Sequence, residues 1–576
     1  MKLALALAAA ICGAAMTAQA AAPPDVIADV IYVGAHILTM EDKGATAVAV
    51  RGDRIVAVGD RAKVLRAKGK GTRVVDLKEQ ALLPGFIDAH GHITGQAAQV
   101  RMVALAPPPV GTVTSVAGVQ EAVRAYIRDK HIAPGQWVVG FGYDDSQLTE
   151  QRHPTRADLD VVSTDIPIYL IHASAHMGVV NTAALRALKI DAATADPPGG
   201  AIRRVAGSRE PDGLLEESAN TQVYAALPTL NALPGGPAAA VADAVEQLRV
   251  AMLTNAAMGI TTVEDGASLP ENLAVLRAAA AADKLPLDVV AHVLWVPPAP
   301  FPEMAGAGAY AGRLKIGGIK MILDGSPQGK TAYLSVPYKV PPPGMGADYR
   351  GAPALPDAVV DAAVREVIGR GLQLQAHANG DAAEQQMIDA VDRTGAQLGR
   401  DAVRKSRVVM IHAQTIREDQ LDRLKALGMI PSFFPAHTFF WGDWHRESVL
   451  GPERAARISP TRSALDRGLP FTIHNDSPVV PPDILRLIWN ATNRVTRSGA
   501  VLGPEQRVPI MAALRAVTIN AAAQNFEEAT KGSLAPGKVA DLVILSADPR
   551  AVPVADLRGI KVVETISRGV TVYRAN

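Results

Sequence analysis

Residues 82–93 read LLPGFIDAHGHI, and the fold can be worked out from this stretch. Its first half is apolar and strand-like, a Pro-Gly pair interrupts it, and it ends in an acidic residue and two histidines. Because side chains two apart on a strand point the same way, we expect Asp88, His90 and His92 on one face at the strand's end. Two imidazoles on one face can hold one divalent metal ion, although His-x-His also occurs as two surface histidines near a turn.

The chain of 576 residues has a globular composition, with 48% hydrophobic and 20% charged residues, so it can bury a large core. Its length suits a large barrel with a small second domain. The formal net charge of +1 argues against nucleic acid or an anionic membrane surface as a partner.

The first twenty residues have the pattern of a secretory signal peptide. Lys2 is followed by an apolar run over residues 3–16 and by an Ala-x-Ala ending at Ala20. The run is too short to span a bilayer, and it contains Cys12, the only cysteine. We therefore predict cleavage after Ala20, a periplasmic or secreted mature chain, no membrane anchor and no disulfide. A buried N-terminal helix is the alternative.

Both ends of the mature chain are rich in short strands separated by Gly and Asp turns. This pattern of short strands and turns predicts a composite β-sandwich domain built from residues 21–83 and 528–576. Between them, over residues 84–527, strand-like runs alternate with helix-like runs, which indicates a parallel sheet. Eight such runs predict an α/β fold of the (β/α)₈ TIM-barrel type. The runs are 82–90, 260–264, 287–295, 316–323, 372–377, 407–412, 429–434 and 470–474.

A long segment of about 95–240 follows the first of these runs and is punctuated by Pro and Gly. It is too long for a plain connection, so we expect an inserted subdomain there.

Polar residues gather at the ends of the predicted barrel strands, where such barrels place their chemistry. Lys320, His377, His412 and Asp476 each lie near the end of a strand-like run. Within the fifth run, Gln373 and Gln375 share a face with His377. Polar side chains inside an apolar strand need partners, and we expect a metal site to supply them.

Taken together, these motifs resemble the amidohydrolase superfamily, and within it amidohydrolase family 3, which includes N-substituted formamide deformylase-like and YtcJ-like enzymes. The resemblance covers nearly the whole mature chain. It rests on PGFIDAHGH (84–92), PTRADLD (154–160), His176, NTAAL (181–185), IK (319–320), DGS (324–326), HA (377–378), GDA (380–382), IHAQ (411–414) and the tail from Gly532 through ADLV (540–543).

The resemblance implies a metal centre. His90 and His92 would bind one ion, while His377 and His412 would bind a second or complete the site. Lys320 would be a bridging ligand after carboxylation by CO₂, because an ammonium with a pKa of about 10.4 cannot bind a cation. Zinc suits such ligands, in one or two ions, as do Mn, Co and Ni.

Asp476 would complete the ligand set and would also move a proton from the attacking water to the leaving amine. The substrate-binding candidates are His176, Asn379 and His474. Three alternatives remain open. Lys320 could pair with Asp324, Asp476 could cap a helix, and His377 and His412 could be hydrogen-bonded core histidines.

The function implied is that of an exported, metal-dependent hydrolase acting on a carbon–nitrogen bond of a small molecule, most simply an amide. Hydrolysis of an ester or a cyclic amide is an alternative, as is a non-catalytic periplasmic binding protein on the same fold. Ala-Asn-Gly after His377 departs from the His-x-x-Glu of mononuclear deaminases of this superfamily. The substrate and the oligomeric state, including homo-oligomers, stay open.

Overall fold

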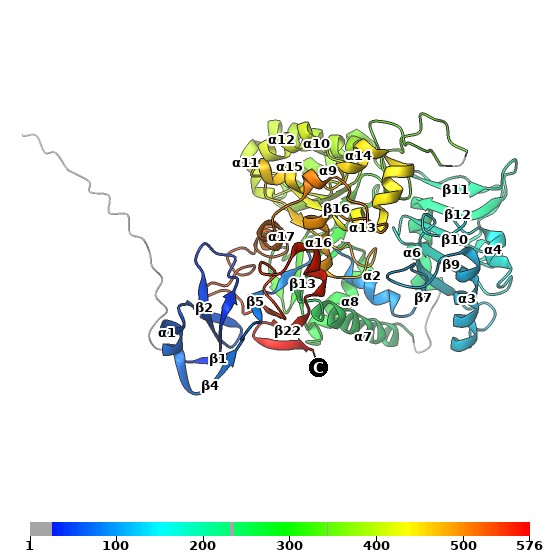
Figure 1. Ribbon diagram of the computed structural model, residues 1–576. Coiled ribbons are helices and arrows are strands. Elements are labelled where there is room, and N and C mark those ends of the chain that lie inside the picture. The colour runs from blue at the N-terminus through cyan, green and yellow to red at the C-terminus, as the bar shows by residue number, and fades with distance from the viewer. Residues whose placement is uncertain (1–25, 231–235, 343, 576) are drawn as a thin grey trace, which may run out of the picture.

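The computed structural model describes residues 26–230, 236–342 and 344–575. The predicted signal peptide and Cys12 lie outside the described residues. Three sheets organise the molecule (Figure 1). Figure 1 places the sheet from the chain ends at the lower left and a second sheet, between residues 103 and 217, at the right. A parallel sheet lies between them.

The parallel sheet contains the eight strands expected from the sequence, in chain order along the sheet. They are β6 (Phe86–Ile87), β13 (Ile260–Ser268), β14 (Asp288–Leu294), β16 (Leu314–Ile322), β17 (Gln373–Ala378), β18 (Val409–His412), β19 (Ile430–Phe433) and β20 (Thr472–Ile473). The short β15 (Tyr310–Ala311) pairs antiparallel with β16. The strands are almost wholly buried, as expected of a parallel sheet covered by helices.

The helices that follow these strands cover the sheet, and most of those between residues 357 and 466 lie together at the top of Figure 1. They are α7 (Gly236–Ala256), α8 (Pro270–Ala281), α9 (Asp357–Gly369), α10 (Asp381–Leu398), α11 (Arg400–Ser406), α12 (Glu418–Leu427), α13 (Ala436–Trp444), α14 (Pro452–Ala456), α15 (Thr461–Asp466), α16 (Ile484–Asn493), α17 (Ile510–Ala516) and α18 (Ile519–Gln524). Among the described residues, no helix is both long enough and apolar enough to cross a membrane.

The sheet curls, but no ladder joins its last strand, β20, to its first, β6, in the described part of the chain. The expected barrel is therefore not closed by strand pairing. The physical reason is that the N–H of Ile87 donates to the carbonyl of Val517 at 2.9 Å, so the outer edge of β6 is already occupied. The two ends meet just beyond the strands instead, where the N–H of His92 donates to Ser477 O at 2.6 Å and that of Asp476 to His90 O at 3.2 Å.

The stretch 82–93 is divided between two sheets rather than forming one strand. Leu82 and Leu83 belong to β5 (Ala81–Pro84), which pairs with β21 (Leu542–Leu545), and only Phe86–Ile87 joins the parallel sheet. The switch occurs at Gly85, whose N–H donates to Asp541 O at 2.8 Å. A Cβ at Gly85 would overlap the side chain of Thr261, so the close crossing of the two sheets requires glycine here.

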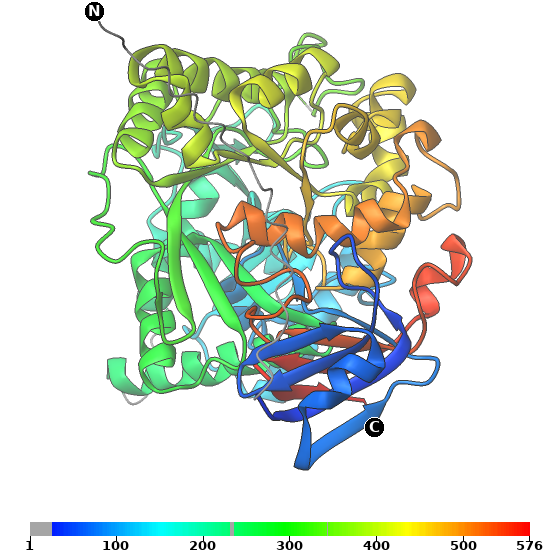
Figure 2. The same cartoon turned by 90° about the vertical axis from the view of Figure 1, so that its left-hand side faces the viewer.

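Strands from both chain ends form one hydrogen-bonded sheet (Figure 2). Its remaining members are β1 (Ala28–Ile37), β2 (Ala45–Arg51), β3 (Arg54–Gly59), β4 (Lys68–Asp76), β22 (Val562–Ser567) and β23 (Val570–Arg574), with the one-turn helix α1 (Arg61–Val64). The ten-residue β1 pairs with β4 along its first part and with β5 along its second. We expected two sheets packed as a sandwich. Because β1 pairs with both β4 and β5, one set of hydrogen-bonded ladders connects the strands that we had assigned to those two sheets.

A buried ion-pair network ties this terminal sheet to the parallel sheet. Lys531 Nζ lies 2.5 Å from Asp288 Oδ2 in β14 and 3.5 Å from Glu527 Oε2. Arg568, at the turn between β22 and β23, also donates to Asp288 at 2.9 Å. Because these charges are paired and hydrogen-bonded, burying them is compatible with a stable fold.

The segment between β6 and β13 carries its own sheet, in the order β11-β12-β10-β9-β8-β7. Its strands are β7 (Val103–Ala104), β8 (Val138–Tyr143), β9 (Ile168–His172), β10 (Met177–Val180), β11 (Gly200–Arg204) and β12 (Pro211–Glu217). Its helices are α2 (Ile93–Gln99), α3 (Val116–Lys130), α4 (Arg156–Asp160), α5 (Thr182–Leu188) and α6 (Ser218–Leu230).

Candidate metal centre

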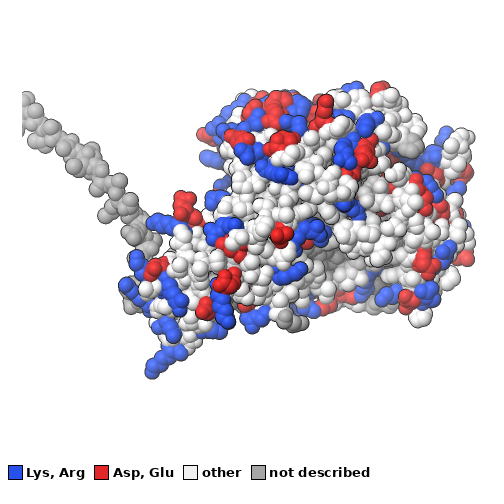
Figure 3. Space-filling model, viewed as in Figure 1, with Lys and Arg blue, Asp and Glu red and all other residues white. Residues whose placement is uncertain are grey.

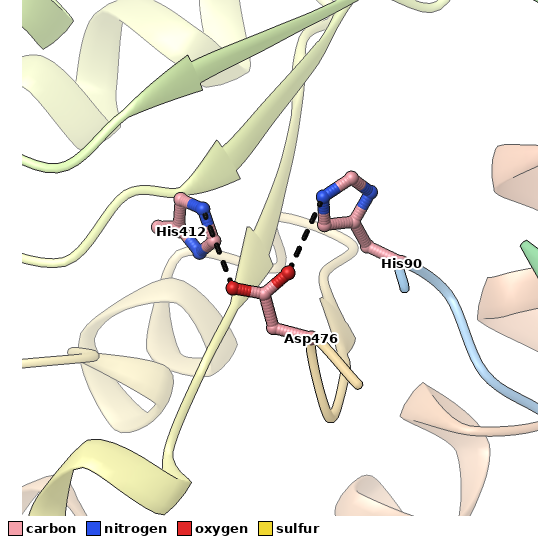
Figure 4. Close-up of side chains that lie close together, drawn as sticks. All are labelled: His90, His412 and Asp476. Atoms are coloured by element: carbon pink, nitrogen blue, oxygen red, sulfur yellow. Dashed lines mark ion pairs between the residues drawn. The ribbon is translucent and has the colours of Figure 1, made fainter. Parts of the chain in front are cut away.

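The predicted ligands converge at the carboxyl ends of the parallel strands. Ligand atoms of His90, His412 and Asp476 all lie within 4.8 Å of one another, and all three residues are buried (Figure 4). Figure 4 shows the carboxylate of Asp476 between the two imidazoles. His90 Nε2 is 3.7 Å from Asp476 Oδ1, and His412 Nε2 is 3.9 Å from Asp476 Oδ2.

His92 and Lys320 border the same group. His92 Nε2 lies 3.2 Å from Asp476 Oδ1, and the rings of His90 and His92 are 5.1 Å apart. Lys320 Nζ lies 3.0 Å from His90 Nε2. Lys320 is 2% exposed and forms no ion pair with a described carboxylate, so its amine points into the site with a candidate metal ligand as its partner.

His377 lies next to this group but turns its nitrogens toward other residues. Its ring centroid is 4.6 Å from that of His412. Nδ1 lies 3.2 Å from Asp324 Oδ1, although the contact lacks hydrogen-bond geometry, and Nε2 lies 3.1 Å from Asn379 Nδ2. The structure therefore brings His377 to the site's edge and does not include it in the closest set of ligand atoms.

The three proposed substrate contacts lie around the centre. His474 Nε2 is 3.2 Å from His412 Nδ1, and its other ring nitrogen is 2.8 Å from Ser432 Oγ. Asn379 Nδ2 donates to Gly325 O at 3.0 Å as well as contacting His377. His176 lies with its ring 4.9 Å from that of His377 and its Nδ1 2.8 Å from Glu217 Oε2.

The donor set fits a divalent cation. Burial lowers the pKa of His90 and of His412 well below the ordinary value, and lowers that of His474 to about 3, so these imidazoles are neutral and offer lone pairs. Asp476 Oδ1 is buried without a partner at hydrogen-bond geometry. Neutral imidazole nitrogen and carboxylate oxygen are the ligands that zinc and similar ions take.

Two of these residues have an unusual backbone conformation. His412 has φ +75° and Asp476 has φ +54°, a region that residues other than glycine rarely occupy. Such strain persists where the surrounding structure enforces it, and it concentrates at functional sites. Here the left-handed turns aim both side chains from the ends of β18 and β20 toward the same point.

Two of the three structural alternatives are wrong. Asp324 does not pair with Lys320, because its carboxylate accepts the backbone N–H groups of Tyr333 at 3.0 Å, Asn379 at 3.0 Å and Gly380 at 2.8 Å. Asp476 is not a helix cap, since the next helix, α16, is capped by Asp483. The third alternative holds in part, because the rings of His412 and His377 do have hydrogen-bond partners.

The interior polar residues of β17 have protein partners rather than a metal ion, which corrects our expectation. Gln375 Nε2 donates to Glu264 at 3.3 Å, while Gln373 Oε1 accepts from His292 Nε2 at 3.2 Å and Gln373 Nε2 donates to Gln524 O at 2.7 Å. These side chains form a polar layer below the metal centre.

Sequence reasoning missed Glu264, which supports His90 from below. Its Oε2 lies 3.5 Å from His90 Nδ1, and burial raises the pKa of its carboxyl to about 8. Gly266 is a second residue that sequence reasoning missed. A Cβ there would overlap the His90 ring, so the position of this ring requires glycine at 266. Glu264 ends the strand-like run 260–264 and Gly266 follows it, and that position was the available signal.

A second group with metal-ligand spacing comprises Asp144, Asp145 and His172 in the inserted segment. His172 Nε2 lies 3.1 Å from Asp145 Oδ1, and Asp144 accepts hydrogen bonds from Ser146 and Trp441. These mutual contacts already satisfy the group, so it is a hydrogen-bonded network in this structure.

Comparison with known proteins agrees with this geometry. The family model described as "Amidohydrolase family" matches residues 73–573. An N-substituted formamide deformylase of Arthrobacter pascens is 30% identical over 95% of this chain and 98% of its own length. The YtcJ protein of Bacillus subtilis (strain 168) is 26% identical over 94% of this chain and 99% of its own.

A solved structure shares the fold. An uncharacterized metal-dependent hydrolase from Pyrococcus horikoshii OT3 superposes with a TM-score of 0.69 at 24% identity, over 91% of this chain and 99% of that one. The family resemblance read from the sequence is confirmed. The chain therefore belongs to the amidohydrolase family and is an enzyme, a hydrolase of carbon–nitrogen bonds.

Proposed function

We propose that this chain is an exported hydrolase that cleaves an amide bond of a small molecule with one or two bound divalent metal ions, zinc being the ion its ligands suit. The observation that carries the proposal is the convergence of His90, His412 and Asp476 at the ends of three parallel strands. His92, Lys320 and His377 border the group and are the remaining proposed ligands. A divalent ion held there would polarise a carbonyl and lower the pKa of water.

Asp476 is the proposed proton carrier. Burial acts to raise the pKa of its carboxyl, but the neighbouring His92, His474 and Lys320 outweigh burial and hold the pKa well below its ordinary value. The carboxylate is thus ionised, and its Oδ1 has no hydrogen-bond partner in the described residues. It would take a proton from the attacking water as the water adds to the amide carbon. It would then pass this proton to the leaving amine nitrogen as the carbon–nitrogen bond breaks.

Lys320 is the proposed carbamate. Burial lowers the pKa of its amine to about 8, which raises the share of neutral amine, the form that adds CO₂. Carboxylation would replace a buried cation by two oxygens and a negative charge beside neutral imidazoles. Asn379, His474 and His176 are proposed to line the substrate side of the centre.

Export and the nature of the partner are proposals from the sequence. The N-terminal pattern supports cleavage after Ala20. On the face shown in Figure 3, basic and acidic side chains are interspersed, and the net charge is +1, which supports a small-molecule substrate rather than nucleic acid. Mass analysis of the protein exported by a bacterial host would test the cleavage site.

The test of function combines metal analysis with activity. The purified mature protein should contain a divalent metal and hydrolyse members of a panel of formamides and longer amides. His90→Ala and His412→Ala should lose both, whereas His131→Asn, a substitution of an exposed histidine in the inserted segment, should keep both. A metal-replete protein that leaves amides, esters and lactams intact would contradict the proposal and favour the binding-protein alternative.

A further inference from the structure

A cavity of about 290 Å³ lies beside the metal centre. Its walls are mostly apolar and include Leu105, Phe141, Trp441 and Val479. A volume near 300 Å³ is at the small end of ligand sites and suits one ring or a short aliphatic chain.

The cavity shares its walls with the catalytic segments. Ser477 and Pro478, which directly follow Asp476, line it, as does Gln96, whose N–H donates to His92 O. His92 is also the accessible member of the centre, with 30% of its side chain exposed against 10% for Asp476 and none for His90. A substrate would therefore reach the centre on the side of His92, one helical turn from Gln96 in the cavity wall.

Aromatic contacts connect the opposite wall to the centre. The ring of Trp441 is 6.4 Å from that of Phe434, which stacks on His474 at 5.3 Å. His474 in turn contacts His412. Trp441 in the cavity wall is thus linked to the metal centre through Phe434 and His474.

One cation, Arg497, lines this cavity. Arg497 forms neither a hydrogen bond nor an ion pair with any residue in the described ranges 26–230, 236–342 and 344–575. The nearby Asp443 is engaged elsewhere. Its carboxylate accepts from Thr496 at 2.9 Å, from Ser498 at 2.8 Å, and pairs with Arg446 at 3.1 Å.

The backbone holds Arg497 in place. It lies near the tip of a tight hairpin in which Thr496 N–H donates to Ala500 O at 2.8 Å and Leu502 N–H to Arg494 O at 2.9 Å. A guanidinium presented this way offers several N–H donors in a fixed plane, which matches the two oxygens of a carboxylate.

Asp144, the acidic residue that lines the cavity, attracts Arg497 electrostatically but accepts its hydrogen bonds from other groups. Asp144 Oδ1 accepts from the N–H and Oγ of Ser146 at 3.0 and 2.6 Å, and Oδ2 accepts from Trp441 Nε1 at 2.6 Å. No ion pair joins Asp144 to Arg497 among the described residues. The N–H donors of the guanidinium therefore have no partner among the described residues and are available to a ligand.

We propose that this cavity holds the part of the substrate distant from the scissile bond, and that this part is an apolar group carrying a carboxylate that pairs with Arg497. The inference rests on the proposed function and narrows its substrate class to small, carboxylate-bearing amides. A charge-assisted, two-point contact in a partly desolvated cavity is expected to favour the carboxylate over a neutral isostere by about 10- to 100-fold.

The test compares matched ligands in two assays. In the first, formate release from N-formylphenylalanine, as both enantiomers, is compared with release from N-formylphenylalaninamide. In the second, calorimetry compares the binding of 3-phenylpropionate with that of 3-phenyl-1-propanol, which needs no turnover. Arg497→Gln is the variant, and Arg128→Gln, which removes an exposed arginine of α3 that pairs with Asp129 and does not line the cavity, is the matched control.

The wild-type protein and Arg128→Gln should prefer the carboxylate at least tenfold in KM and in binding. Arg497→Gln should lose that preference, read as the ratio of KM values and of dissociation constants between the acid and its neutral partner. Equal binding of the acid and the alcohol by wild type would overturn the inference even if amides are hydrolysed. Preferential binding of the acid without any formamide hydrolysis would support the cavity's assignment and count against the proposed reaction.

Discussion

Replacing Lys320 by methionine should stabilise the metal-free protein while abolishing its activity. The Lys320 amine is buried and contacts His90 but no carboxylate within ion-pair distance among the described residues. Burial lowers its pKa from 10.5 to about 8. At about 1.36 kcal/mol per pKa unit, keeping the ammonium in the folded protein costs on the order of 3 kcal/mol. Methionine fills a similar volume without charge, so the variant should recover most of that cost.

The stability gained by Lys320→Met should decrease as the pH rises. Below pH 8 the amine is protonated in both the folded and the unfolded chain, so the full cost of about 3 kcal/mol applies. As the pH rises from 8 to 10.5, the folded-state amine loses its proton first and the cost disappears. Urea denaturation of metal-stripped protein, followed by tryptophan fluorescence, should show a large gain for Lys320→Met at pH 7 and a small one at pH 10.

Lys531 provides the matched control, because it is also a buried lysine but is ion-paired, at 2.5 Å from Asp288. Lys531→Met removes this ion-pair partner of the buried Asp288 carboxylate and should destabilise the protein by about 3–5 kcal/mol. If Lys320→Met were as destabilising as Lys531→Met in the metal-free state, the amine would be a structural element. It would then be wrong to explain the free-energy cost of burying the Lys320 ammonium by a role in function.

Three further predictions concern the centre. Asp476→Asn should lower kcat by about 10²- to 10⁴-fold in samples whose metal content is measured in parallel, and a loss below tenfold would remove its role as proton carrier. Gly266→Ala should displace the His90 ring and reduce metal loading, as read by elemental analysis; a fully loaded variant would show that the ring can move without cost. His474→Ala should change the relative kcat/KM for formamides and longer amides while metal content, read by elemental analysis, stays intact. Lost metal would instead show that His474 orients His412, which it contacts at 3.2 Å.

Much of the fold could be predicted because its signals are local. Alternation of strand-like and helix-like runs predicted the eight parallel strands, since hydrophobic periodicity is a property of short windows. The His-x-His pattern after Phe86–Ile87, with His412 and Asp476 after later strands, predicted convergence, because parallel strands end at one edge of their sheet.

The tertiary structure alone decided how these elements meet. Leu82 and Leu83 are as apolar as Phe86, and only the pairing of β5 with β21, more than 450 residues later, assigns them to another sheet. The contact of His90 with Glu264, the partners of Gln375 and the position of Arg497 in a cavity wall likewise depend on residues distant in the chain. Long-range contacts of this kind leave no periodic trace in the sequence, because whether a buried polar group is satisfied depends on what packs against it and not on its neighbours along the chain.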